Sequence, residues 1–160
     1  MPDFDPAHVE RGGPPHRYGG GPLEVTKLHV GPYENNAYLL RDPETNDGLL
    51  VDAANEAERL LELLEGVRLV GIVTTHHHPD HIQALAGVLK AHDVWNGAHP
   101  ADADTIADLV GVTPDRVLEH GDVLTVGGHA VTVLHTPGHG DDTLVEREVP
   151  QLDEWKARGW

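Results

Sequence analysis

Apolar and polar residues follow two different periods along the chain, and each change of period marks a boundary between predicted elements. Three strand-like segments, residues 24–30, 36–41 and 48–52, are separated by Gly, Pro and Asn turn residues and predict an antiparallel meander. Residues 69–73 are apolar without interruption, which is typical of a strand buried on both faces. The first half of the chain is therefore expected to build a sheet.

Apolar residues recur at helical spacing in three further segments. They predict helices over about residues 55–65, from Pro79 onward, and over about residues 101–110. Residues 123–126 and 130–134 flank a Gly-Gly pair and predict a β-hairpin. Strands that alternate with helices in this way indicate an α/β fold.

The two ends of the chain differ in composition from its middle. Residues 1–22 are rich in Pro, Gly and charge and offer little apolar surface, so we expect a flexible leader there. Residues 150–158 predict a short helix. At 160 residues the chain is long enough for one domain but short for two, so residues 23–160 are expected to form a single domain.

Composition narrows the class of partner and the chemistry. Eleven basic against 27 acidic residues give a formal net charge of −16, which repels nucleic acid and anionic membranes and favours a small-molecule substrate. Cysteine is absent, which excludes disulfides, thiolate ligands and a cysteine nucleophile. No signal peptide or membrane-length apolar run is present, so we expect a soluble cytoplasmic protein.

Four potential metal ligands follow the buried strand within six residues. His76 and His78 are two positions apart, about 6.5 Å in extended chain, and a curling loop can draw them around one cation. Asp80 and His81 come next, where the side chains can point back across the loop, whereas His77 should face away. A solvated histidine loop or a tag is the alternative, but the run is internal and lies at a strand end. Nitrogen and oxygen ligands without sulfur suit zinc, iron or manganese.

These residues resemble the signature of a known family. The pattern His76-x-His78-x-Asp80-His81, followed by a Thr-Pro-Gly-His segment ending at His139, resembles the metallo-β-lactamase fold superfamily and its glyoxalase II-like (hydroxyacylglutathione hydrolase) branch. The resemblance implies an αββα sandwich in which His76, His78 and His139 hold one metal. It implies that Asp80 and His81 help to hold a second.

The resemblance extends to Asp52, which occupies the place of an acidic residue that orients a metal-bound histidine in the family; an ordinary turn aspartate is the alternative. It breaks after His139, where residues 138–143 already look like the last-ligand motif of the family and the middle section with the bridging aspartate is absent. We therefore expect a sandwich that is incomplete in its second half. Asp141 or Asp142 could replace the missing ligand there, and a solvated turn or a helix cap is the favoured alternative for these two residues. An open sheet edge there would favour a homodimer.

The resemblance implies a metal-dependent hydrolase that uses one or two Zn²⁺ per chain, with Fe or Mn as alternatives. Metal-bound hydroxide would attack a carbonyl, and Asp80 would help to orient the water as well as bind metal. A thioester is the favoured substrate because a thiolate leaves readily. The alternatives are a truncated metal-binding remnant with little or no catalysis and a mononuclear iron enzyme similar to persulfide dioxygenases.

Overall fold

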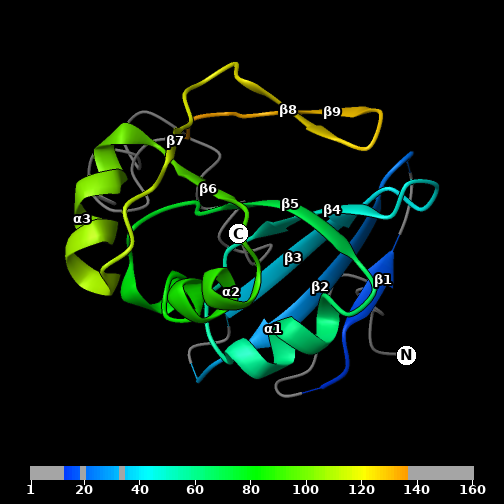
Figure 1. Cartoon of the computed structure of the whole chain (residues 1–160), viewed down its shortest axis with the longest axis horizontal. Helices are drawn as coiled ribbons and strands as arrows, with labels where there is room; N and C mark the ends of the chain where they lie inside the picture. Colours follow the sequence, from blue (N-terminus) through cyan, green and yellow to red (C-terminus); the bar gives the residue numbers. More distant parts are fainter. Residues whose placement is uncertain (1–12, 19–20, 33–34, 137–160) are drawn as a thin grey trace, which may run out of the picture.

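A mixed seven-stranded sheet forms the centre of the molecule, with helices on one face and a separate hairpin on the other (Figure 1). The computed structural model describes residues 13–18, 21–32 and 35–136. The sheet strands, in spatial as well as chain order, are β1 His16–Tyr18, β2 Glu24–Val30, β3 Asn35–Arg41, β4 Asp47–Val51, β5 Arg68–Val73, β6 Trp95–Ala98 and β7 Arg116–Val117. The helices are α1 Ala57–Leu63, the 3-10 turn η1 Pro79–His81, α2 Leu85–Ala91 and α3 Pro100–Val110, and the hairpin is β8 Val123–Val126 with β9 His129–Thr132.

The direction of the strands changes in the middle of the sheet. Neighbours from β1 to β4 pair antiparallel, and neighbours from β4 to β7 pair parallel. The carboxyl ends of β4, β5 and β6 therefore meet at one edge, which is where open α/β sheets place their ligands. The loops that leave these three strands begin at Asp52, Thr74 and His99.

Two apolar cores lie on the opposite faces of the sheet. The larger core joins the sheet to α1, α2 and α3, and its fully buried members include Leu50, Leu60, Ile72, Leu85 and Ile106. The smaller core joins the sheet to the hairpin and is built from Leu49, Leu118, Leu124 and Val126. Helices on one face and a second β layer on the other give the α/β layering expected from the sequence, over the part of the chain that the structure describes.

The predicted meander, the buried strand, the three helical segments and the hairpin are confirmed, with several differences. The leader prediction is wrong for residues 16–18, which form β1 by pairing their backbone with β2 and need no apolar side chains to do so. The helix after Pro79 is two elements, η1 and α2, because the backbone leaves the helical region at Ile82, whose side chain is buried. β7 was not predicted, since two exposed residues carry no periodic signal. The predicted helix at residues 150–158 lies outside the described residues.

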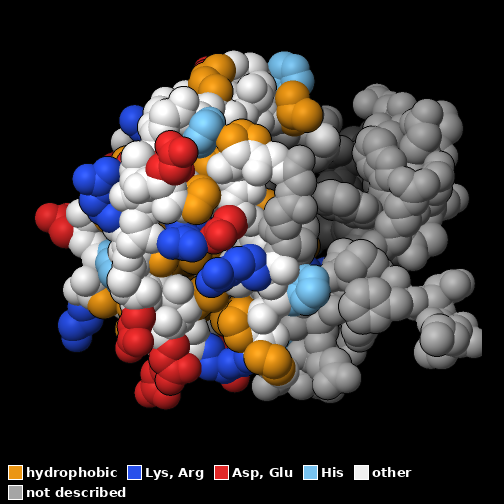
Figure 2. All heavy atoms as spheres, turned by 90° about the vertical axis from the view of Figure 1, so that its right-hand side faces the viewer, with side chains coloured by type: hydrophobic (Ala, Val, Ile, Leu, Met, Phe, Trp, Pro, Cys, Tyr) orange, Lys and Arg blue, Asp and Glu red, His pale blue; other side chains and the backbone are white. Residues whose placement is uncertain are grey.

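The outer surface carries charges of both signs. Acidic and basic side chains are interspersed on the face shown in Figure 2, with small apolar areas between them. Among the described helices, none has the length and apolar character that crossing a bilayer requires.

The hairpin meets the sheet at its tip, where Gly127 lies against Asp42. Asp42 is buried and accepts hydrogen bonds from the Glu44 amide (2.9 Å) and the Thr45 hydroxyl (3.0 Å), so it has little room to move. A Cβ at Gly127 would overlap the Asp42 carboxylate, and the φ of +61° also favours glycine.

Gly127→Ala is therefore expected to lower the free energy of unfolding by about 2 kcal/mol, measured by urea denaturation. Gly128→Ala is the matched control, because a Cβ there meets no heavy atom within 4 Å. Equal stability of the two variants would contradict the assignment of the hairpin contact.

Candidate metal centre

The histidine cluster occupies the loop between β5 and η1, and backbone contacts hold this loop from both sides. At its start, the Asp52 amide donates to the Val73 carbonyl (2.8 Å) and the Thr74 amide to the Gly97 carbonyl (2.9 Å), so the loop leaves the sheet in a defined direction. At its end, the His81 amide donates to the His78 carbonyl (2.9 Å) and closes the 3-10 turn. Pro79 opens that turn at a position where no amide proton is needed.

This loop brings together the four described residues that the sequence predicts as ligands. The ring centroids of His76 and His81 are 4.1 Å apart, and those of His76 and His78 are 4.7 Å apart. The Asp80 carboxylate lies 3.8 Å from Nε2 of His81. His139, Asp141 and Asp142 lie outside the described residues, so their roles stay predictions.

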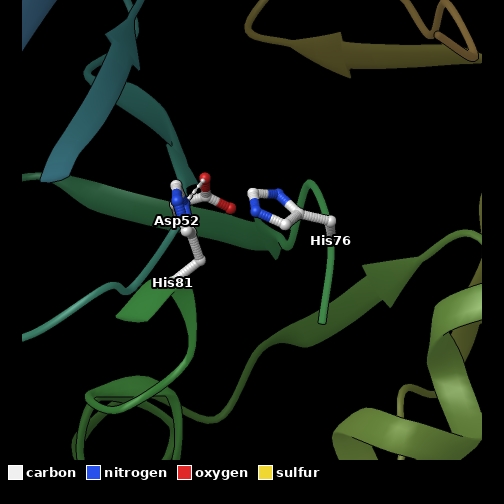
Figure 3. A group of neighbouring side chains, drawn as sticks. All are labelled: Asp52, His76 and His81. Atoms are coloured by element: carbon white, nitrogen blue, oxygen red, sulfur yellow. Dashed lines mark hydrogen bonds and ion pairs between the residues drawn. The ribbon is translucent and has the colours of Figure 1, made fainter. Parts of the chain in front are cut away.

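Asp52 points from the end of β4 into the same cluster, where it pairs with His81 and lies near His76 (Figure 3). One donor atom from each of Asp52, His76 and His81 lies within 4.8 Å of the others. Nδ1 of His81 is 2.9 Å from Oδ2 of Asp52. The Thr75 amide and hydroxyl each donate to Asp52 at 2.7 Å, and the Thr75 hydroxyl oxygen is 2.8 Å from Nδ1 of His76. The contact between Asp52 and a histidine that the sequence predicts is thus confirmed.

The hydrogen bonds fix the tautomers of both histidines. A carboxylate only accepts, so Nδ1 of His81 carries the proton that it shares with Asp52. The Thr75 hydroxyl spends its single proton on Asp52 and therefore accepts from Nδ1 of His76. In its neutral form each imidazole then holds its lone pair on Nε2, the state in which a histidine ligates a metal through that atom.

The donor set fits a divalent cation. Among the described residues, donor atoms within 4.8 Å of one another come from Asp52, His76 and His81. The His78 ring lies beside His76, and the Asp80 carboxylate lies beside His81. Nitrogen and oxygen donors without sulfur suit zinc or iron. Asp52 already accepts three hydrogen bonds, which favours an orienting role for it over direct ligation.

Asn35 at the start of β3 fixes Asp80. Its side-chain amide donates to the Asp80 carboxylate (3.0 Å) and to the Asp80 carbonyl (2.9 Å). Burial acts to raise the pKa of Asp80, but the hydrogen bond from Asn35 and the nearby His81 and His78 outweigh it, so the pKa lies below 3.8. Asp80 is therefore held as a carboxylate, the state a ligand needs.

His81 responds in the opposite direction. Burial acts to lower its pKa, but the hydrogen bond to Asp52 and the charges of Asp52 and Asp80 outweigh this effect, and the pKa is raised above 6.5. The two carboxylates thus favour a proton on His81 in the metal-free protein. Since a cation must displace the proton from Nε2, metal uptake is expected to release protons near neutral pH.

Asn35→Ala is expected to raise the pKa of Asp80, measured by carboxyl NMR titration of the metal-free protein. A lowered pKa stabilises the fold above the unfolded value of 3.8, and this stabilisation is lost as pH falls through the folded pKa. The stability difference between wild type and Asn35→Ala should therefore be larger at about pH 7 than at about pH 3. A difference that does not depend on pH would contradict the contact. Asn36→Ala, at the neighbouring position of β3, is the control.

Sequence reasoning missed three partners of the loop: Asn35, Thr75 and Asp102. Asp102 in the first turn of α3 accepts from the backbone amide of His77 (3.3 Å) and pairs with its ring Nδ1. His77 is thus directed to α3, as the prediction that it faces away requires. Asn35 and Asp102 lie 45 and 25 residues from their partners, and no local pattern signals such contacts.

Comparison with known proteins agrees with this geometry. The family model described as the metallo-beta-lactamase superfamily matches residues 30–148. A hydroxyacylglutathione hydrolase of Rhodopseudomonas palustris (strain HaA2) is 40% identical over 113 residues, which is 69% of this chain and 42% of that protein. The chain belongs to the metallo-β-lactamase superfamily.

Solved structures show the same fold. The B3 metallo-beta-lactamase BLEG-1 superposes with a TM-score of 0.63 and 27% identity, over 72% of this chain and 62% of that one. TTHA1623 in a di-iron-bound form superposes with a TM-score of 0.55 and 35% identity, over 71% of this chain and 61% of that one. In all three comparisons the chain spans less than two thirds of the length of its relative. The chain thus has an α/β metallo-β-lactamase fold and covers part of the full fold of these relatives.

Proposed function

We propose that the chain is a metal-dependent hydrolase of the hydroxyacylglutathione hydrolase type. It would cleave a thioester at a centre of one or two cations, whose ligands are His76, His78, Asp80, His81 and His139. The observation that supports the proposal is the network around Asp52, which pairs directly with Nδ1 of His81 and, through the Thr75 hydroxyl, with Nδ1 of His76. Both rings use Nδ1 for these contacts, so the lone pair of each neutral ring lies on Nε2. The relatives named hydroxyacylglutathione hydrolase support the reaction class.

A bound divalent cation would lower the pKa of water from 15.7 to about 7 and polarise the substrate carbonyl. The protein residues supply the rest. Asp52 and Thr75 set the tautomers of the two histidines, and Asn35 keeps Asp80 ionised and aimed at the centre. Asp80 is also placed to accept a proton from a nucleophilic water. Zinc suits these donors, and the di-iron form of TTHA1623 supports iron as the alternative.

A metal-binding protein with little or no catalysis is the second candidate. It is favoured by the share of the relatives that the chain covers, 42% of the hydroxyacylglutathione hydrolase, because ligands and substrate contacts of the whole enzymes can lie in the remainder. The two candidates make the same prediction for metal content and opposite ones for turnover.

Thiol release from acyl thioesters tests the proposal. Protein loaded with zinc or ferrous iron is assayed on an acyl-glutathione and an acyl-coenzyme A, with the matching oxygen ester as control substrate. Turnover of a thioester that chelation abolishes and added metal restores is the expected result. Tight metal binding without turnover of either thioester would overturn the hydrolase and favour the second candidate.

A further inference from the structure

Two aspartates bind the loop between β5 and η1, residues 74–81 with its 3-10 turn, from opposite sides, and each set of contacts is called a clamp. This segment is the ligand loop. On one side Asp52, at the end of β4, holds Thr75 and His81. On the other side Asp102, in the first turn of α3, holds His77, the residue between the first two predicted ligands. The second clamp, formed by His77 and Asp102, contains none of the predicted metal ligands.

Asp102 fixes both the backbone and the side chain of His77. Its Oδ1 accepts from the His77 amide (3.3 Å) and is also the partner of ring Nδ1, so the pair forms a small ring of contacts. The side chain of Asp102 is 17% exposed and that of His77 is 35% exposed, which shields the pair from solvent in part. Fixing the backbone at His77 also fixes how His76 and His78, its two neighbours, are oriented to each other. The planes of their rings are at 80°.

The clamp is anchored in the larger core. α3 begins at Pro100, is capped by His99, whose ring accepts from the Ala101 amide (3.1 Å), and packs on the sheet through the fully buried Ile106. A contact to its first turn therefore ties the loop to a rigid element.

We infer that His77 and Asp102 are positioning residues that set the relative orientation of His76 and His78 at the metal centre. This inference rests on the proposed site but not on the proposed reaction. Without the pair, the loop keeps its contacts with Asp52 and Asn35, but the backbone between His76 and His78 is no longer tied to α3. The metal then binds more weakly and in a different geometry.

Binding of Co²⁺ followed by visible absorption tests the inference, because its d–d bands report ligand geometry. His77→Leu and Asp102→Ala are each expected to weaken Co²⁺ binding by about tenfold and to shift the bands. His77→Asn should restore wild-type affinity and spectrum, since its amide nitrogen takes the place of Nδ1 as donor to Asp102. Asp104→Ala, which removes an exposed carboxylate from the same helix, should leave both unchanged.

The double variant His77→Leu/Asp102→Ala should be no worse than either single variant, because the two residues act through one contact. Wild-type affinity and spectra in both His77→Leu and Asp102→Ala would overturn the inference. So would a loss of Co²⁺ affinity in His77→Asn or in Asp104→Ala as large as the loss in His77→Leu. A wild-type protein that binds Co²⁺ with the expected variant pattern but turns over no thioester would overturn the proposed reaction alone.

Discussion

Asp52→Asn is expected to weaken metal binding by about 100-fold and to reduce any hydrolysis in proportion. The asparagine keeps the size of the side chain and tolerates the φ of +62° at this position, so the backbone is unaffected. Its amide nitrogen cannot accept the Nδ1 proton of His81, and one of the two contacts with Thr75 is lost as well. Both imidazoles lose the group that sets their tautomer. Competition with a chromophoric chelator measures the affinity.

Two connections leave Asp52, one to His76 through the Thr75 hydroxyl and one directly to His81, and Thr75→Val separates these two arms. The substitution removes the hydroxyl between Asp52 and His76 but keeps the direct contact of Asp52 with His81. We therefore expect metal affinity to fall by about tenfold. If Asp52→Asn binds metal as tightly as wild type, Asp52 is an ordinary turn aspartate. If Thr75→Val is as damaging as Asp52→Asn, the division of the two arms is wrong.

Gly71→Ala is expected to lower the free energy of unfolding by about 3 kcal/mol. Gly71 lies in the middle of β5, opposite Trp95 of β6, and a Cβ there would overlap the indole ring. The ring cannot simply swing away, because it packs in the smaller core and Arg116 lies 4.4 Å above it. Since β5 leads directly into the ligand loop, displacement of the strand should also weaken metal binding.

A double-mutant cycle identifies the cause. Trp95→Leu vacates the space above Gly71, so adding Gly71→Ala to Trp95→Leu should cost much less than adding it to wild type. Gly21→Ala, where a Cβ meets nothing within 4 Å, controls for the loss of a glycine. Additive costs in guanidinium denaturation would show that the overlap with Trp95 is not the reason.

The sequence predicts those parts of the site that depend on local order. His76, His78, Asp80 and His81 follow one buried strand within six residues, so their convergence needs only a strand end and a turn. Asp52 is also predictable, because it ends the neighbouring strand and parallel strands end at the same edge of the sheet.

The remaining supports come from tertiary packing. Asn35 reaches Asp80 because β3 starts beside the end of β4, and Asp102 reaches His77 because α3 begins at the end of β6. Neither contact has a period or a spacing in the sequence. In the same way, β1 is a polar segment whose pairing with β2 depends on backbone groups, which all sequences share.

The most direct test of the metal centre is elemental analysis of the purified wild-type protein beside His81→Ala, after both have been supplied with zinc and iron. His92→Ala, at the end of α2, keeps the same number of histidines as His81→Ala and is the control. We predict at least one equivalent of metal per chain in wild type and His92→Ala, and its loss in His81→Ala. Equal metal content in all three proteins, or none in wild type, would contradict the assignment of a cation to this loop.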